Sequence, residues 1–172
     1  MLKIIGALLV IIVCSLFGFR IGKYFQLRPI QLRELRSLLN LLETEIVYAS
    51  TPLPIALEKL AHRCSKPLDT LFLTTREGLL SGYGLTAAEA WEKGVAKIKN
   101  VIMLDPEDLS ILNDFGMGLG SSDKQEQIKH LELTKEYLKQ QEYKAEQKKV
   151  QNERLCKTMG FLTGMIIVLI MY

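Results

Sequence analysis

Three glycines spaced two residues apart, Gly116, Gly118 and Gly120, come nearest to a phosphate-binding loop in this 172-residue sequence. Glycine-rich loops bind phosphate when they follow a strand and open a helix, or when Gly-Lys-Ser or Gly-Lys-Thr ends them. Here the residues up to Phe115 have helical spacing, and no lysine follows in register. We therefore interpret the three glycines as a helix end followed by a tight turn.

Other residue types that carry chemistry are scattered. His62 and His130 have no partner at metal-ligand spacing, and Glu43 and Glu45 cannot face one another on a helix because they are two residues apart. The three cysteines, at positions 14, 64 and 156, form no C-x-x-C pair. The sequence predicts no catalytic residues, no metal site, no cofactor and no disulfide. A membrane-tethered enzyme, with polar groups converging from distant helices, stays a less favoured alternative.

Apolar residues recur at spacings of three and four through residues 24–157, which predicts helices, and no segment alternates as a strand would. The first helix has Pro29 in its first turn, while Arg33, Arg36 and Asn40 face away from its apolar side. That side consists of Leu32, Leu35, Leu38, Leu39, Leu42 and Ile46. With 48% hydrophobic residues and about 130 positions, this region is long enough to bury one core.

Residues typical of helix N-termini precede the next four helices. They are Thr51 with Pro52 and Pro54, Ser65 with Pro67, Thr86 with Glu89, and Asp105 with Pro106. The glycines in residues 81–84 and 116–120 end the third and fifth helices. A sixth helix is expected from about Ser122 to the end of the chain. Its polar second half is interpreted as a stalk, with pairing to a neighbouring chain as the alternative.

Two runs without charge lie near the ends of the sequence, from Ile4 to Phe19 and from Thr158 to Tyr172. Each is slightly short of the ~20 residues that span a bilayer, but flanking residues extend it. We expect transmembrane anchors at 1–23 and 158–172, in preference to a cleaved signal peptide and a buried core helix respectively. Lysines and arginines gather on the inner flanks, so the positive-inside rule predicts a cytoplasmic domain at 24–157 with both termini on the opposite side. The net charge of +3 is therefore attributed to topology and not to nucleic-acid binding.

Three long motifs resemble one known family. They are "RPIQLRELRSLLNLLETEIVYASTPLPIALEKLA", "FGMGLGSSDKQEQIKHLEL" and "NERLCKTMGFLTGMIIVLIM", in the same order and at the same spacing as in the stage III sporulation protein AB family. The resemblance covers nearly the whole chain. It implies an all-α fold, a six-helix bundle similar to the type II secretion F platform domain, flanked by N- and C-terminal transmembrane helices.

The resemblance also implies a function. The expected protein is a non-enzymatic, membrane-anchored platform or adaptor in a channel complex between mother cell and forespore, placed in the mother-cell membrane around the forespore. Its expected partners are the other subunits of that complex, above all a secretion-type ATPase, stage III sporulation protein AA, together with membrane lipid. Secretion platforms carry two such domains and three membrane helices, whereas this chain has one domain, so it is expected to form homo-oligomers or to use other membrane subunits. A structural spacer acting only through its membrane helices is the alternative.

Candidate contact residues follow from exposure and from the motifs. Arg33, Arg36 and Glu43 are predicted to meet a partner, with simple solvation of a helix face as the alternative. The family-motif positions whose role stays open are Thr51, Pro52, Leu53, Gly116, Gly120, Asp123, Gln127 and His130.

Overall fold

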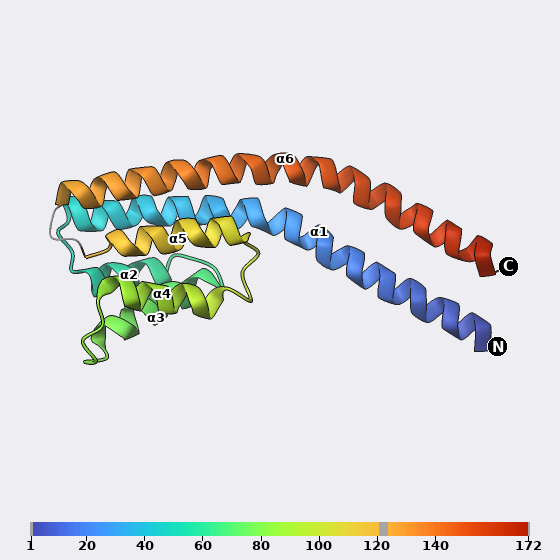
Figure 1. Cartoon of the computed structure of the whole chain (residues 1–172), viewed down its shortest axis with the longest axis horizontal. Helices are drawn as coiled ribbons and strands as arrows, with labels where there is room; N and C mark the ends of the chain where they lie inside the picture. Colours follow the sequence, from blue (N-terminus) through green and yellow to red (C-terminus); the bar gives the residue numbers. More distant parts are fainter. Residues whose placement is uncertain (1, 121–123, 172) are drawn as a thin grey trace. The chain divides into compact units, whose positions relative to one another are not determined.

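The computed structural model describes residues 2–120 and 124–171, and the side chains of residues 22–120 and 125–152. The elements in these residues are α1 (Leu2–Glu43), the π-helical segment η1 (Thr44–Tyr48), α2 (Leu53–Ala61), α3 (Leu68–Leu80), α4 (Ala87–Ile98), α5 (Pro106–Gly118) and α6 (Lys124–Met171) (Figure 1). No strand occurs in this described part of the chain. The predicted all-α fold with six helices is confirmed.

The chain divides into two compact units. Residues Ile30–Glu142 form one, which we name the bundle unit, and Met1–Pro29 with Tyr143–Tyr172 form the other, the end unit. The bundle unit is shorter than the predicted 24–157 domain. Among the residues whose side chains are described, 22–120 and 125–152, no helical segment meets the length and hydropathy needed to cross a bilayer. The predicted anchors at 1–23 and 158–172 lie almost wholly outside the described side chains.

The core of the bundle unit surrounds one tryptophan. Trp91 of α4 is fully buried and its Nε1 donates to the Leu112 carbonyl oxygen of α5 over 2.7 Å. Its ring meets Phe72 of α3 and Phe115 of α5 edge to face, with centroids 6.0 and 5.1 Å apart. Such aromatic pairs prefer this geometry and add to the free energy of burial. The predicted α1 stripe is buried at Leu32, Leu35, Leu38, Leu39 and Leu42, while Ile46 is half-buried.

Two predicted helix starts are confirmed in atomic detail. Thr86 Oγ1 accepts from the Glu89 backbone N–H, and the Glu89 carboxylate accepts from the Thr86 backbone N–H over 2.8 Å, which is a capping box. Asp105 begins α5 with the same reciprocal arrangement, using the carboxylate of Asp108. Short-range chemistry therefore decides where α4 and α5 begin.

Two other predicted caps are wrong. The residue that caps α2 is Pro52 and the one that caps α3 is Pro67, neither with a side-chain hydrogen bond. Thr51 Oγ1 instead donates to Glu45 over 2.7 Å, and Ser65 donates to Glu34 from both its hydroxyl and its backbone nitrogen. An ionised carboxylate is a strong acceptor, and it takes the hydroxyl hydrogen of Thr51 from six residues earlier and that of Ser65 from thirty-one residues earlier.

The role predicted for Pro29 is also wrong. It lies inside α1, which runs without a break from Leu2 to Glu43. A proline inside a helix removes one hydrogen bond and destabilises it by ~3 kcal/mol. The helical hydrogen bonds of the residues before and after Pro29, together with the burial of the proline ring, offset this loss. The helix predicted to begin near residue 29 is therefore the continuation of an earlier one.

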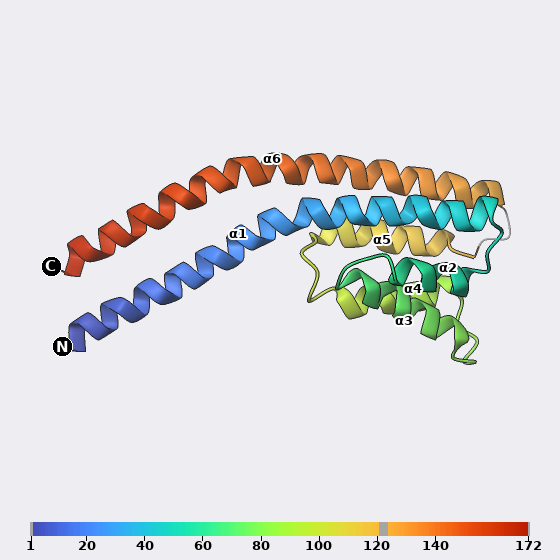
Figure 2. The ribbon, with the colours of Figure 1, turned by 180° about the vertical axis from the view of Figure 1, so that it is seen from behind.

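Successive helices of the bundle unit run in alternating directions, so its connections gather at two ends (Figures 1 and 2). End A consists of residues 44–52, 81–86 and 116–120, the last range including the final turn of α5, and end B consists of residues 62–67 and 99–105. A Cβ added to Gly120 would lie 3.0 Å from Ala87 Cβ, which places the end of α5 against the start of α4 at end A.

Candidate functional site

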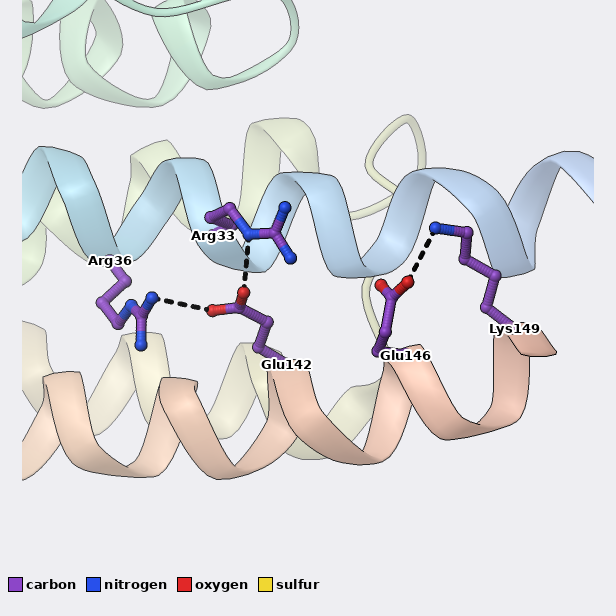
Figure 3. A network of polar contacts seen from close by, with 5 residues as sticks. All are labelled: Arg33, Arg36, Glu142, Glu146 and Lys149. Atoms are coloured by element: carbon purple, nitrogen blue, oxygen red, sulfur yellow. Dashed lines mark hydrogen bonds and ion pairs between the residues drawn. The ribbon is translucent and has the colours of Figure 1, made fainter.

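The predicted contact residues on α1 are paired with α6. Arg33 Nε donates to Glu142 Oε1 over 2.7 Å, and Arg36 Nη2 lies 3.2 Å from Glu142 Oε2 (Figure 3). Glu43 accepts from Lys135 over 2.6 Å. Glu142 is only 12% exposed, whereas Arg33 is 62% exposed. These pairs join the two helices, and their use by a partner stays a prediction.

A shallow groove of about 310 Å³ lies between these two helices. Its lining consists of Arg36, Asn40, Glu132, Lys135, Glu136 and Lys139. Each of its cations already faces a carboxylate, the third pair being Lys139 with Glu136 at 3.3 Å. A small anion would have to compete with all three pairs, so the groove does not favour phosphate binding.

The described side chains assemble no metal site. No group of three histidine, cysteine or carboxylate side chains in residues 22–120 and 125–152 has metal-binding geometry. His62 and His130 are both exposed, and Cys64 is free. Burial, aided by the nearby Glu34 carboxylate, raises the pKa of the Cys64 thiol to about 12, which removes its nucleophilic form at neutral pH. In the end unit, Glu146 and Lys149 pair within α6 at 2.9 Å (Figure 3).

The first part of end A is the turn that joins α1 to α2. Glu45 accepts from Lys59 Nζ and from Thr51 Oγ1, each over 2.7 Å, and its backbone oxygen accepts from the Thr51 N–H. The hydrogen bonds from Lys59 and then Thr51 lower the pKa of Glu45. A single carboxylate therefore fixes the turn, and Tyr48 within it is 81% exposed. The sequence analysis considered Glu45 only as a partner of Glu43 and missed its part in this turn.

The second part of end A is the last turn of α5. A Cβ at Gly116 would lie 2.4 Å from Trp91 Cδ1, closer than any side chain allows. Gly120 has a φ of 84°, in the region that favours glycine. The interpretation of these glycines as a helix end and turn is confirmed. Between them Met117 is 76% exposed.

The other motif positions lie around this turn or outside the described part. A Cβ at Gly118 would lie 3.0 Å from the ring of His130, so this histidine lies beside the turn. Gln127 is half-buried, and Asp123 lies outside the described residues.

The third part of end A is the turn between α3 and α4. Gly82 and Gly84 have φ values of 72° and 68°, and Tyr83 between them is 87% exposed. Tyr83, Tyr48 and Met117 are the three most exposed large hydrophobic side chains in the part of the chain whose side chains are described. We name them the end-A apolar residues. Tyrosine and methionine are enriched at protein interfaces, so their position on the three turns of one end favours a protein contact.

Comparison with known proteins gives one family. The model of the stage III sporulation protein AB family matches residues 3–172. The chain belongs to this family. It is 35% identical over 171 residues to the stage III sporulation protein AB of Bacillus subtilis (strain 168), covering 99% of each chain. A solved structure of a stage III sporulation protein AB matches with a TM-score of 0.68 and 36% identity, over 72% of this chain and 96% of that one.

Membership of the family gives the motif residues a context. The Thr-Pro-Leu motif places Thr51 on Glu45, Pro52 at the start of α2, and the half-buried Leu53 as its first residue. The glycine motif allows α5 to approach Trp91 and then turn. Two of the quoted motif stretches therefore form two of the three turns of end A.

Proposed function

We propose that the chain is a membrane-anchored platform or adaptor subunit of a secretion-like channel complex between mother cell and forespore, and that its bundle unit docks a secretion-type ATPase. The observation that carries this proposal is the set of end-A apolar residues, in a chain whose family is a sporulation family. The turns that carry Tyr48, Tyr83 and Met117 leave these large apolar side chains exposed. Such side chains are better suited to protein contact than to catalysis.

The proposal includes a fold relationship and a location. The bundle unit is taken to be similar to the cytoplasmic domain of type II secretion F platform proteins, in which a helix, a turn and a Pro-Leu restart recur. The α1–η1–α2 segment with Pro52 and Leu53 supports this similarity. The segments at 1–23 and 158–172 would hold the chain in the mother-cell membrane, with the bundle unit in the cytoplasm. The lysine and arginine count on the inner flanks supports that orientation.

Binding of purified stage III sporulation protein AA to the full chain in lipid nanodiscs tests the proposal, with and without nucleotide. We expect saturable binding at micromolar concentration. Replacing Tyr83 and Met117 by serine should weaken it at least ~10-fold, because central interface anchors carry most of the binding energy. The matched control is Tyr137→Ser on α6, where the tyrosine is 52% exposed and outside end A.

Two results would contradict parts of this proposal. Absence of binding at high micromolar concentration, with the chain folded in the nanodisc, would reject docking of the ATPase. Binding that is weakened by charge reversal at Arg33 and Arg36, but not by the end-A substitutions, would place the docking surface on α1 instead.

A further inference from the structure

The outer face of α2 and α3 carries an ion pair that joins the two helices. Arg76 Nη2 of α3 lies 3.3 Å from Glu58 Oε2 of α2, and the two side chains are 30% and 44% exposed. The next residue on each helix, Glu77 or Lys59, is exposed and lies about 100° further round, on the outer side of the pair. Lys59 also donates to Glu45. Across this face the charges therefore alternate in sign, in the order Glu77, Arg76, Glu58, Lys59.

Exposed aliphatic side chains surround the ion pair. Ile55 precedes Glu58 by three residues, while Leu73 and Leu80 lie three residues before and four residues after Arg76. Residues three or four apart share one side of a helix, so these side chains lie on the same face as the pair. They are 48%, 37% and 57% exposed, respectively. We name them, together with the four charged residues, the α2–α3 face.

This combination distinguishes the α2–α3 face from the groove between α1 and α6. The groove also contains ion pairs between its helices, but all of its lining residues are polar or charged. Protein interfaces are most stable where apolar side chains exclude water around a few paired polar groups. The α2–α3 face therefore has the composition of a protein interface.

The charge order of the α2–α3 face is its own complement. The two helices run antiparallel (Figures 1 and 2), and most homo-oligomers use the same patch on both subunits, related by a two-fold axis. An axis parallel to the helices sets Arg76 opposite Glu58 of the second copy, and Glu77 opposite its Lys59. An axis across the helices would instead set Arg76 opposite Arg76, which like-charge repulsion disfavours. The charges therefore select the parallel axis.

The aliphatic side chains match under the same symmetry. Because the helices are antiparallel, Ile55 and Leu80 both lie toward end A from the ion pair, by ~4.5 and ~6 Å along the axis. Ile55 of one copy therefore faces Leu80 of the other, and the contact occurs twice. Toward end B, Leu73 faces the exposed ring of His62 in the same way.

Arg76 and Glu58 can each hold a second partner. A guanidinium has five N–H donors and a carboxylate has about four acceptor positions, whereas the ion pair within one copy uses a single contact. As an exposed pair it contributes little to stability, because water screens it. The surrounding aliphatic side chains of two copies would exclude that water and strengthen each pair.

We propose that the α2–α3 face binds a second copy of this chain, in a two-fold symmetric dimer whose axis runs parallel to α2 and α3. Arg76 pairs with Glu58 of the second copy, and Ile55 packs on its Leu80. The dimer does not require the proposed docking of an ATPase. It places both ends A at the same end of the dimer, so that one partner meets two sets of end-A apolar residues.

Energy transfer between full chains in detergent, fused to a donor or an acceptor fluorescent protein, measures the association. Arg76→Glu and Glu58→Arg each set like charges opposite one another in the dimer. We expect either variant alone to self-associate at least ~10-fold more weakly than the wild type. A mixture of the two variants restores opposite charges at both symmetric positions, so its association should reach at least the wild-type level.

A matched ion pair on α6 controls for the change in charge. Glu136 and Lys139 are exposed and lie 3.3 Å apart. Glu136→Lys and Lys139→Glu, alone or mixed, should leave the association unchanged. Fluorescence of Trp91 in the unfused chains verifies that each variant is folded.

Substitutions without a change in charge test the same face, including the case in which a like-charge variant does not fold. Ile55→Ser with Leu80→Ser should weaken the association at least ~10-fold, since buried anchors carry most of the binding energy of an interface. Leu133→Ser with Tyr137→Ser removes side chains of similar exposure, 46% and 52%, from α6 and should have no effect.

Three results would overturn this inference. Wild-type chains that show no energy transfer at high micromolar concentration would reject the dimer. Folded charge variants that do not regain association when mixed would reject the pairing of Arg76 with Glu58. Association that the substitutions on α6 weaken as much as those on the α2–α3 face would place the contact elsewhere. Because binding of stage III sporulation protein AA is measured separately, failure of the dimer and failure of the docking are distinguishable.

Discussion

Replacing Gly116 by alanine places a methyl carbon 2.4 Å from Trp91 Cδ1, whereas carbon atoms in contact are normally ~3.5–4.0 Å apart. The indole must move by more than ~1 Å, yet Phe72 and Phe115 pack against it and Leu112 accepts its N–H. Overpacking of this kind destabilises by ~1–3 kcal/mol. A strained hydrogen bond adds ~1 kcal/mol, and the higher helix propensity of alanine returns ~1 kcal/mol. We expect a net loss of about 2 kcal/mol.

Urea unfolding of the full chain in detergent measures this loss directly. Trp91 is the only tryptophan, so its fluorescence reports the core of the bundle unit alone. With a slope of ~2 kcal/mol per molar urea, the midpoint should fall by about 1 M. The control is Gly118→Ala, whose new methyl group would meet the exposed ring of His130 at 3.0 Å. That ring can turn away, so the free energy of unfolding should change by less than ~1 kcal/mol.

A second chain, with Trp91 replaced, tests whether the loss of stability comes from the contact between the new methyl group and the indole. In a Trp91→Phe chain followed by far-UV circular dichroism, Gly116→Ala should be less destabilising, because the smaller phenyl ring leaves more room for the methyl group than the indole does and the two sites are coupled. A loss below ~0.5 kcal/mol for Gly116→Ala in the wild-type background would refute the reasoning, since it would show that the core accommodates the methyl group freely.

Two further predictions concern single ionisable groups. Because its partners lower the pKa of Glu45 in the folded chain, its contribution to stability is present above the usual value of 4.5 and is lost as the pH falls through the lowered pKa. Glu45→Gln should therefore reduce the urea midpoint at neutral pH but change it little in acid. The control, Glu136→Gln on the surface of α6, should not show this difference between the two pH values. An equal effect of Glu45→Gln at both pH values would contradict the prediction. With its pKa at about 12, Cys64 should be alkylated at least ~100-fold more slowly than a free thiol at pH 8 in a chain lacking Cys14 and Cys156, and urea should abolish the difference. Fast alkylation of the folded chain would show that the thiol is not desolvated.

The features predicted correctly from the sequence depend on neighbouring residues. The capping box at Thr86 needs only residues three positions apart, the start of α5 at Asp105 and Pro106 needs only neighbours, and the leucine stripe of α1 follows from helical period alone. The turn at Gly120 likewise follows from local backbone preference. These interactions join residues within one or two turns of helix, so a sequence pattern is enough to predict them.

The features predicted wrongly depend on residues distant in sequence. Ser65 donates to Glu34, thirty-one residues earlier, which only the packed helices bring near, and Thr51 donates to Glu45 across the irregular turn between α1 and α2. The spacing of three glycines correctly indicated a turn, but the need for glycine at position 116 comes from Trp91, twenty-five residues earlier. The end-A apolar residues could not be recognised because exposure is a property of the assembled bundle unit.

The pairing of Arg33 with Glu142 has a mechanical consequence. Glu142 is the last residue of the bundle unit and Arg33 is three residues from its first, so the chain enters and leaves the unit across one ion pair. A sideways force that pulls these two points apart acts on that pair first and reaches the Glu43–Lys135 pair only afterwards. The two ion pairs would then break one after the other. Force along the helix axes would instead load both pairs at once.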